Sequence, residues 1–425
     1  MVILVAGATG FLGGALAQSL ARRGHTIIGT TRDPSTVQDN GAIRHWVKAD
    51  YECDHDVAHW VARVEGAEVA VNAVGIFRES GGKTFESIHV RAPRALFAAC
   101  VQAGVRVVQI SALGADDEAQ TAYHRSKCAA DKFLLGIDPG AVILQPSLVY
   151  GLRGTSAASF NVLAALPVIP LPGSGMQRIQ PIHIGDVVDA ITSVIEREER
   201  RTGRIPLVGP EPVTLKQYFA ALRNSMGLGK ARFIPIPSPV LVIAARVCAL
   251  FPRMLLGPDS LRMLSRGNTA DPAQTCRLLG RPPRPVTAFI APEESELARL
   301  RASKTWLLAV LRISIAIVWI VSGIVSLGLY PVEESYRLLA RVGVTGTFAP
   351  VALYGAALAD LALGVATLVL WRKHWLWAGQ AALIVAYTLV ISFALPEFWL
   401  HPFGPIVKNL PMLAALWLLH QCDRR

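Results

Sequence analysis

The stretch that decides the fold is "VILVAGATGFLGGALAQSLARRG", residues 2–24. A short run of β-forming residues leads into a glycine-rich turn, and a helical pattern follows with leucine at positions 12, 16 and 20. A strand, a glycine-rich turn and a helix in this order place a pyrophosphate on the N-terminus of the helix. The sequence therefore predicts a dinucleotide-binding unit whose turn residues contact the cofactor: Gly7, Thr9, Gly10, Phe11, Leu12 and Gly13.

A second predicted strand, "TIIGTT", ends at Thr31, where an NAD-selective site places an acid on the ribose. Thr31 and Arg32 occupy that place instead. A guanidinium can bind a 2′-phosphate through charge-assisted hydrogen bonds, and no carboxylate is present there to repel it. We therefore predict NADP as the cofactor and NAD as the alternative, in which case Arg32 is solvated or pairs with Asp33.

Strand and helix patterns alternate further along the chain, through "IRHWVKAD", "EVAVNAVG", a helix at 85–103, "RVVQISALGA", a helix near 123–135 and "AVILQPSLVYG". This alternation predicts an α/β fold with a doubly wound parallel sheet. Asp50, Val74 and Gly75 fall at strand ends, where the adenine and its ribose would lie. For Asp50 a role in a loop or a helix cap is the alternative.

Several motifs occur in one order: the glycine-rich turn, Ser111, Tyr123-x-x-x-Lys127 and "PSLVYG" at 146–151. With them the chain resembles an extended or atypical short-chain dehydrogenase/reductase. Residues 160–191 resemble the branch that contains the nucleotide-binding accessory subunit of respiratory complex I. The resemblance covers roughly residues 1–290 and implies a Rossmann core at 1–150 and a small substrate lobe and membrane-proximal segment at 151–300.

The resemblance implies a catalytic triad of Ser111, Tyr123 and Lys127. Tyr123 would exchange the proton at a carbonyl or alcohol, Lys127 would lower the pKa of the tyrosine and bind the nicotinamide ribose, and Ser111 would hydrogen-bond the reacting oxygen. Physical chemistry supports the pairing, because a phenol with a pKa of about 10 is a poor base and a cation one helical turn away stabilises the phenolate.

One position departs from the family pattern. The long helix before the triad usually offers an asparagine that holds a proton-relay water, and His89 stands there instead. A histidine can also hold a water. The related complex I subunit binds its nucleotide without turning it over, so the triad is either competent or a structural remnant.

Composition separates the C-terminal end from the rest of the chain. Of the 425 residues, 52% are hydrophobic and 17% charged, and the formal net charge is +11. Residues 217–304 hold 13 basic and 5 acidic residues, an excess that favours a surface facing anionic lipid over nucleic acid. The six cysteines are far apart and match neither a disulfide framework nor a metal site.

Four apolar stretches follow, at Trp306–Leu329, Pro350–Trp371, Trp375–Leu395 and Ile406–His420. The first three have about the twenty residues that a membrane span needs, and the fourth is short. Basic residues before the first span, between the second and third, and at the C-terminus place both ends and the nucleotide domain in the cytoplasm. We predict a multi-pass protein of the cell inner membrane.

Residues from roughly Thr305 onward resemble the DoxX-like membrane family, which implies a four-helix transmembrane bundle at 301–425. Some relatives of that family are linked to quinone-coupled oxidation. Two ionisable residues, Arg312 and Asp360, lie inside predicted spans and are predicted to form an ion pair that locks the bundle; a functional role of these groups within the membrane is the alternative.

Two smaller features have open interpretations. The apolar stretch Ser238–Pro258 contains Arg246 and Arg253 and is either an interfacial amphipathic helix or a lid of the substrate lobe. Pro181, His183 and Asp186 are predicted to form a strand end and a helix cap rather than a catalytic group.

These features lead to one main functional hypothesis and two alternatives. The main one is a membrane-anchored NAD(P)H-dependent oxidoreductase acting on a hydrophobic carbonyl or alcohol. The second is a nucleotide-binding scaffold or assembly protein for a membrane redox complex, without turnover. The third, a bundle that passes electrons to quinone, has no haem, flavin or metal motif behind it.

Overall fold

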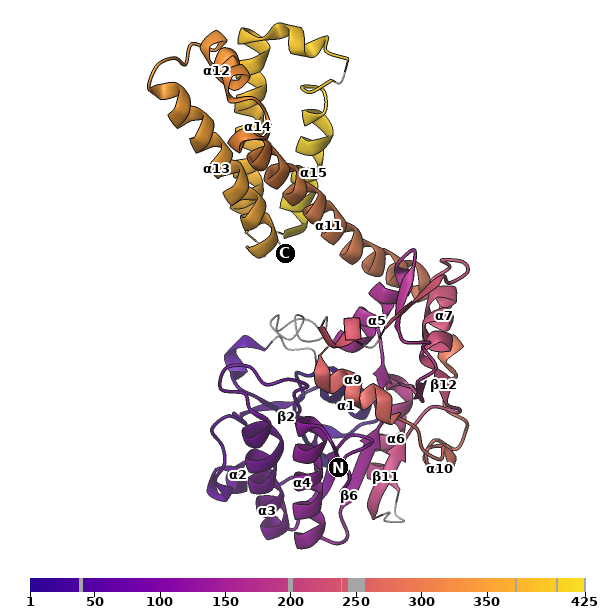
Figure 1. The fold of residues 1–425 in the computed structure, drawn as a ribbon. Coiled ribbons are helices and arrows are strands. Elements are labelled where there is room, and N and C mark those ends of the chain that lie inside the picture. Colours follow the sequence, from indigo (N-terminus) through magenta and orange to yellow (C-terminus); the bar gives the residue numbers. More distant parts are fainter. Residues whose placement is uncertain are drawn as a thin grey trace. The chain divides into compact units, whose positions relative to one another are not determined.

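The computed structural model describes residues 1–37, 41–197, 202–237, 239–243, 257–370, 373–402 and 404–423 (Figure 1). The chain divides into two compact units, unit 1 from Met1 to Ala302 and unit 2 from Ser303 to Arg425. Unit 1 has an α/β fold and the described part of unit 2 is helical.

Unit 1 is built on a seven-stranded sheet in the order β11-β6-β5-β4-β1-β2-β3, and every neighbouring pair is parallel. The chain winds outward in one direction from β1 through β2 to β3 and in the other through β4 to β6, which confirms the predicted doubly wound sheet. The switch point between β1 and β4 is where such sheets bind ligands. The strands are β1 Val2–Ala6, β2 Thr26–Thr31, β3 His45–Lys48, β4 Val69–Asn72, β5 Arg106–Ile110, β6 Val142–Pro146 and β11 Gly203–Leu207.

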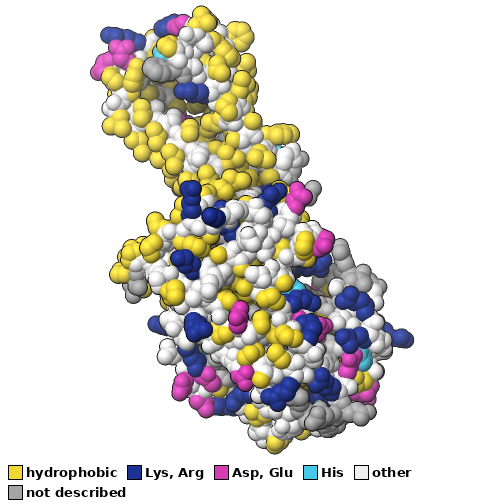
Figure 2. Space-filling model, turned by 90° about the vertical axis from the view of Figure 1, so that its right-hand side faces the viewer, with side chains coloured by type: hydrophobic (Ala, Val, Ile, Leu, Met, Phe, Trp, Pro, Cys, Tyr) yellow, Lys and Arg dark blue, Asp and Glu magenta, His cyan; other side chains and the backbone are white. Residues whose placement is uncertain are grey.

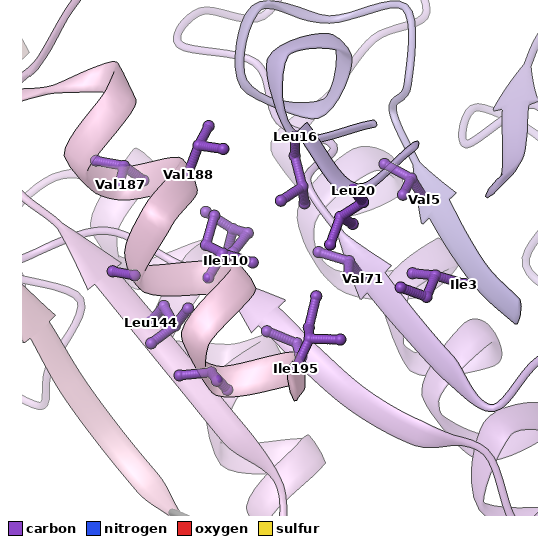
Figure 3. Packing of buried hydrophobic residues seen from close by; sticks show 14 of the residues in the cluster. Ile3, Val5, Leu16, Leu20, Val71, Ile110, Leu144, Val187, Val188 and Ile195 are labelled. Carbon is purple, nitrogen blue, oxygen red and sulfur yellow. The ribbon is translucent and has the colours of Figure 1, made fainter. Parts of the chain in front are cut away.

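Helices cover both faces of this sheet, which is why its central strands are mostly apolar. On one face, Leu16 and Leu20 of α1 and Val187 of α6 pack against the strands (Figure 3). On the other face, Trp60 of α2 and Phe97 of α3 belong to a second core. The helices are α1 Phe11–Arg22, α2 Val57–Val64, α3 Ala92–Ala103, α4 Ala122–Ile137 and α6 Ile184–Glu196.

The helix predicted at 85–103 has two parts. It begins as a π-helical turn, Glu86–Arg91, and continues as α3. Pro93 has no N–H group, so the carbonyl of His89 lacks its usual partner four residues on, and a wider turn accommodates the proline ring. This turn carries His89 toward the switch point.

The chain after Tyr150 forms a smaller lobe but also completes the Rossmann core, because α6 and β11 come from the segment predicted as the substrate lobe. The predicted apolar stretch Ser238–Pro258 lies mostly outside the described residues. The lobe contains β7 Val149–Tyr150, α5 Thr155–Ala165, β8 Ile169–Pro172, β9 Arg178–Ile179, β10 Ile182–His183, β12 Val213–Thr214, α7 Leu215–Ser225, β13 Phe233–Ile236, α9 Pro258–Arg266 and α10 Ala273–Leu279.

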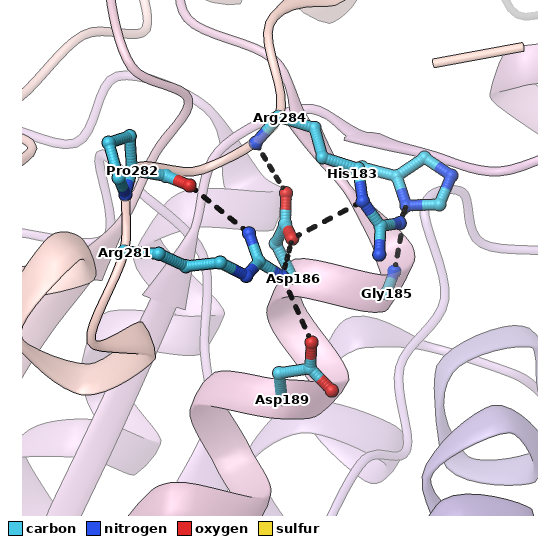
Figure 4. A network of polar contacts seen from close by, with 7 residues as sticks. All are labelled: His183, Gly185, Asp186, Asp189, Arg281, Pro282 and Arg284. Atoms are coloured by element: carbon cyan, nitrogen blue, oxygen red, sulfur yellow. Dashed lines mark hydrogen bonds and ion pairs between the residues drawn. The ribbon is translucent and has the colours of Figure 1, made fainter. Parts of the chain in front are cut away.

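A polar network fastens residues 281–284 to the start of α6 (Figure 4). Asp186 is fully buried, and it accepts hydrogen bonds from Arg281 Nη2 at 2.7 Å and from the Arg284 backbone N–H at 2.8 Å. His183 caps α6 by accepting from the Gly185 N–H. The predicted structural role of His183 and Asp186 is therefore confirmed, and Asp186 also neutralises two arginines.

Among the described residues, three helices are long and apolar enough to cross a membrane: α11 with its π-helical end (Pro292–Leu329), which begins in unit 1, and α13 (Phe348–Val369) and α14 (His374–Ala394) of unit 2. They correspond to the first three predicted spans. The predicted fourth span is α15, Asn409–Asp423, which is shorter. A short amphipathic helix, α12 (Val332–Arg341), lies in the loop after the first span. Hydrophobic side chains cover most of the visible face of unit 2 (Figure 2).

The predicted ion pair between Arg312 and Asp360 is wrong. Arg312 Nη2 lies 3.0 Å from Asp423 Oδ2 and stacks over the Trp377 ring. Asp360 Oδ2 instead accepts a hydrogen bond from Ser322 at 2.8 Å. Both side chains point into the bundle, but Arg312 reaches α15 rather than α13, a pairing across 111 residues that local spacing could not indicate.

Candidate nucleotide and proton-transfer site

The glycine-rich turn joins β1 to α1 with a close approach of backbone to backbone. Gly7 has a φ of +81°, and a Cβ atom on Gly13 would lie 2.2 Å from the Gly7 carbonyl oxygen. The Gly10 N–H donates to that same oxygen at 2.8 Å. Side chains at positions 7 and 13 would therefore push the helix away from the strand.

The N-terminus of α1 is open to a ligand. Gly10 is the N-cap and supplies no side-chain acceptor to the first N–H groups of the helix, and the first turn has no acid. A helix N-terminus of this kind favours the binding of an anion, because its first N–H groups are available as donors and the helix dipole is positive there. Thr9 is exposed beside it. Leu12, in contrast, packs into the core. The Phe11 ring lies against the backbone at Gly151, in the segment that follows β7.

The end of β2 carries a charged pair that the sequence pattern did not predict. Arg32 is exposed, and its Nη1 lies 3.8 Å from Glu52 Oε1. The Asp33 carboxylate is not available to Arg32 in this geometry, because it accepts a hydrogen bond from the Ser35 N–H within its own turn. Asp50 Oδ1 accepts from the Glu52 N–H at 3.0 Å and thereby shapes the turn that holds Glu52. A carboxylate is therefore present beside Arg32, supplied by the turn after β3.

Val74 and Gly75 follow β4 at the same edge of the sheet. The Val74 N–H donates to Asn72 Oδ1 at 3.3 Å, and a Cβ atom on Gly75 would meet Lys127 Nζ at 3.2 Å and His89 Nε2 at 3.5 Å. Only a glycine leaves the lysine in place without a shift. Gly75, which is predicted to bind the cofactor, therefore lies beside Lys127 of the predicted triad.

Tyr123 and Lys127 lie one turn apart on α4, which starts at a Thr121 cap. Lys127 Nζ donates to the backbone carbonyls of Val74 and Ile110, each at 3.2 Å, and these bonds anchor it at the ends of β4 and β5. Two of its three donors are used in this way. Burial lowers the pKa of Lys127 to about 8.

The Tyr123 ring lies among aromatic side chains, with ring centroids at 5.4 Å from Phe77 and 6.1 Å from Phe85. Burial raises its pKa to about 12, and the Asp131 carboxylate adds to the rise. Within the described residues, no hydrogen bond of the Tyr123 hydroxyl is found. The phenol is therefore protonated at neutral pH and its oxygen is open to a ligand in an apolar setting.

Ser111 and Asp131 form a buried pair behind the tyrosine. Ser111 Oγ donates to Asp131 Oδ2 at 2.5 Å, and both side chains are buried. Burial raises the pKa of Asp131 to about 6, although the bond from Ser111 and the charge of Lys127 act in the opposite direction. In this geometry the single hydroxyl proton of Ser111 points at Asp131.

His89 is also fully engaged. Its Nε2 accepts from the Ile76 N–H at 3.0 Å, so Nδ1 carries the proton and donates to Ser126 Oγ at 2.9 Å. Burial and the nearby Lys127 ammonium lower the pKa of His89 far below its usual value, which keeps the ring neutral. With both nitrogens occupied, the side chain has no atom left for the relay water that the sequence suggested.

Comparison with known proteins gives two family matches. Residues 3–209 match the NAD dependent epimerase/dehydratase family, and residues 316–417 match the DoxX-like family. The chain joins an epimerase-type nucleotide domain to a DoxX-like membrane domain. Both resemblances found in the sequence are thereby confirmed, and the chain combines a nucleotide-binding fold with transmembrane helices.

Two relatives illustrate the range of the nucleotide domain. The mouse mitochondrial NADH dehydrogenase (ubiquinone) 1 alpha subcomplex subunit 9 is 26% identical over 267 residues, 57% of this chain and 65% of that protein. The chain thus spans less than two thirds of this relative. A ceramide reductase of Caulobacter vibrioides is 26% identical over 249 residues, 57% of this chain and 76% of that protein.

A solved structure supports the fold of this domain. UDP-glucuronic acid 4-epimerase from Bacillus cereus, in complex with UDP-glucuronic acid and NAD, matches with a TM-score of 0.53 at 18% identity. The match covers 71% of this chain and all of that chain. At this identity the likeness shows a shared fold alone.

The epimerase-type domain contains two site residues that sequence reasoning missed, Asp131 and Glu52. Asp131 stands four residues after Lys127, as Lys127 stands four after Tyr123, so helical spacing already placed it on the same face of α4. Glu52 had no such signal, because it approaches Arg32 through the turn that follows another strand. Among the described residues, no cluster of three potential metal ligands is found.

Proposed function

We propose that this protein is a membrane-anchored, NAD(P)H-dependent reductase of a hydrophobic carbonyl compound. The observation that carries the proposal is the Tyr123 hydroxyl, which has no hydrogen bond within the described residues while its ring lies between Phe77 and Phe85. A protonated phenol at an apolar opening, one helical turn from an anchored lysine, suits delivery of a proton to an oily substrate.

Each side chain has a distinct part in this proposal. A bound nicotinamide nucleotide would supply the hydride to the carbonyl carbon. Tyr123 would donate its proton to the carbonyl oxygen, and Lys127 would stabilise the resulting phenolate and offer its third N–H to the nicotinamide ribose. Because the pKa of Tyr123 is about 12, the acid form dominates at neutral pH and favours reduction over oxidation.

Ser111 can act on the substrate only if its hydrogen bond to Asp131 breaks. To hydrogen-bond the reacting oxygen, its hydroxyl would have to leave Asp131 and rotate toward the substrate. A serine that keeps its present bond would instead hold Asp131 in place behind Lys127.

The proposed cofactor is NADP, with NAD as the alternative. The family of the nucleotide domain is NAD-dependent, and Arg32 is the group that would favour a 2′-phosphate. Glu52 opposes this, because its carboxylate lies beside the same guanidinium. NADP binding therefore requires Arg32 to leave Glu52 or Glu52 to turn away.

The proposed location is the inner membrane, with the nucleotide domain in the cytoplasm. Support comes from the DoxX-like domain, from three helices that could span a bilayer and from the basic residues beside them. One relative is a reductase whose name specifies a lipid, ceramide, which agrees with the apolar opening at Tyr123.

A second candidate function is a nucleotide-binding scaffold for a membrane redox complex. Two observations favour it: the mouse relative is named as a subunit of NADH dehydrogenase, and the Ser111 proton is committed to Asp131. In that case, the nucleotide would stabilise the fold and Tyr123 would have no chemical task.

One experiment separates the two functions. Full-length protein in lipid nanodiscs is screened for NADPH and NADH oxidation against long-chain aldehydes and ketones, and Tyr123→Phe is compared with the wild type. The reductase proposal expects turnover to fall about 10²–10⁴-fold, since general acids contribute that much, with nucleotide affinity unchanged. Tyr218→Phe, which removes a buried hydroxyl from α7, is the matched control and should keep its activity.

The scaffold proposal expects the opposite pattern. No carbonyl would be turned over, Tyr123→Phe would behave as the wild type, and Gly13→Ala would lose nucleotide and stability together because its Cβ collides with the Gly7 carbonyl. Nucleotide binding without oxidation across the whole screen would overturn the reductase proposal.

A further inference from the structure

The substrate lobe exposes a cluster of large apolar side chains. It consists of six residues, named here the lobe patch, with exposed fractions of 43–62%: Val168, Met176, Ile234, Val240, Val242 and Ile243. Side chains of this size are usually exposed singly, and a contiguous group of them marks an interaction surface. On the part of unit 1 that Figure 2 shows, hydrophobic side chains also stand next to Lys and Arg.

Backbone pairing brings the lobe patch together. β8 and β13 form a parallel pair in which Pro170 lies opposite Ile234, so Val168, the residue just before β8, is next to the strand that carries Ile234. Met176 lies four residues after β8. The helical residues 239–243 begin just after β13, where the Leu241 N–H donates to the Pro237 carbonyl. The six side chains therefore come from one two-stranded sheet, the turn after it and the helical residues after it.

The sequence around the lobe patch is basic. Between Glu211 and Asp259 the sequence contains no acid and six basic residues. Three of these, Lys216, Lys230 and Arg232, are exposed, and the Lys216 ammonium lies 5.5 Å from the centre of the Phe233 ring on β13. A stretch of chain that mixes apolar side chains with cations and contains no acid suits a lipid surface with anionic headgroups.

One helix, α11, connects the lobe to the first apolar span. Ser295, in the first turns of α11, donates to the backbone carbonyl of Ser225 at the end of α7 at 2.6 Å. From Ser295 the same helix runs on to Trp306, where the apolar span begins. At 1.5 Å per residue this part of the helix is only about 16 Å long. The lipid interface is thus within reach of the lobe without any further linker.

We propose that the lobe patch inserts into the interface of the bilayer that the membrane domain spans. The occupant is lipid because the patch is apolar and bordered by basic residues, and because the protein is already tethered within reach of that interface. Interfacial segments of this kind bury apolar side chains a few ångströms into the headgroup region while basic residues contact the phosphates. The inference does not depend on turnover at Tyr123.

Photo-crosslinking in nanodiscs of phosphatidylethanolamine and phosphatidylglycerol tests this directly. The photoreactive amino acid p-benzoylphenylalanine replaces Met176 or Ile234 in the full-length protein, and the mass of the intact protein is measured after irradiation. Matched controls carry the probe at Val61 and Val101, which are 41% and 42% exposed on α2 and α3. We expect a phospholipid adduct at positions 176 and 234 at a yield at least fivefold above that of the controls.

Two outcomes would overturn the proposal. Adduct yields at 176 and 234 equal to those at 61 and 101 would mean that the patch faces water. A covalent dimer in place of a lipid adduct would assign the patch to a second copy of the chain. Removing phosphatidylglycerol should lower the lipid yield, and Lys230→Glu with Arg232→Glu should lower it in the same way.

Discussion

Asp131 is the ionisable residue on which the electrostatics of the site depend most. It lies two helical turns from Tyr123, fully buried, with Ser111 on one carboxylate oxygen and no hydrogen-bond partner within the described residues on the other. Its charge raises the pKa of Tyr123 and partly restores that of Lys127. One carboxylate thus acts on all three residues of the predicted triad.

Replacing Asp131 with asparagine should change how stability depends on pH. The folded-state pKa is about 6, above the ordinary value of 3.8, so the native state holds a proton that the unfolded state has released. Stability contributed by this group is therefore lost as pH rises from about 4 to about 6. Asparagine can still accept from Ser111 and carries no charge, so the variant should gain thermal stability over the wild type as pH rises from 5 to 7.

Thermal unfolding of both proteins in detergent at several pH values measures this difference. A difference between variant and wild type that is constant from pH 5 to 7 would contradict the raised pKa. Comparing the two proteins at each pH removes the contributions of titrating groups that do not interact with Asp131.

Arg32 and Glu52 should set cofactor preference in opposite directions. Arg32→Ala should lower the affinity for NADPH about 10–100-fold relative to NADH, because charge-assisted hydrogen bonds contribute about 1.5–3 kcal/mol. Glu52→Gln should raise the same ratio, since it frees the guanidinium and removes a charge that repels a 2′-phosphate. Fluorescence titration with both nucleotides measures the ratio, and two unchanged ratios would place the 2′-phosphate elsewhere.

The residues that sequence reasoning located are those whose position follows from local spacing. Tyr123 and Lys127 share a helix face, and Gly7, Gly10 and Gly13 share one turn, so short-range periodicity was enough. The partner of Arg312 was missed because Asp423 is 111 residues away. The roles assigned to the tyrosine, the lysine and the glycines, as to Ser111 and Arg32, stay predictions.

At the scale of elements, α11 and α13 cross closely in the membrane domain because two glycines remove side chains from the contact. A Cβ atom on Gly364 would lie 2.5 Å from Ile320 Cγ1, and one on Gly323 would lie 2.7 Å from Leu361 Cγ. Small residues at such contacts let transmembrane helices pack by van der Waals attraction. Asp360 and Ser322 join the same two helices by their hydrogen bond.

Gly364→Val should therefore push α11 and α13 apart. Overpacking of a tight contact costs about 1–3 kcal/mol, so we expect a lower unfolding temperature in detergent. Gly355→Val is the matched control on the same helix, because nothing lies within 4 Å of a Cβ atom there. Equal unfolding temperatures for the two variants would show that the crossing is not as close as described.

The sequence predicted the strands and main helices of the sheet in unit 1, but it missed a π-helical turn there and a short helix in unit 2. Alternating strand and helix patterns were sufficient for the sheet because its central strands are buried and mostly apolar. The π-helical turn at Glu86–Arg91 was missed, since a single proline shifts the hydrogen bonds without altering the apolar pattern. Helix α12 was missed because its polar residues were read as a loop.

At the scale of the whole molecule, the number of membrane crossings decides where the C-terminus lies. Three helices are long enough to span, and α15 has 15 residues. We expect α15 to cross as well, with both ends in the cytoplasm, because basic residues lie next to each cytoplasmic end. Reporter fusions after Arg425 and within residues 331–347 should read cytoplasmic and periplasmic, whereas a periplasmic C-terminus would leave three spans.

The network at Asp186 has a consequence for the order of events during synthesis. Its arginine partners, Arg281 and Arg284, are joined to the growing chain 95 and 98 residues after it. At roughly 5–20 residues per second, the ribosome takes about 5–20 s to make that stretch. Until then the carboxylate lacks these counter-charges, so its burial in a closed unit 1 is costly before Arg284 has emerged. The first apolar span begins about twenty residues later, and closure of the nucleotide domain and delivery of that span to the membrane are therefore nearly simultaneous.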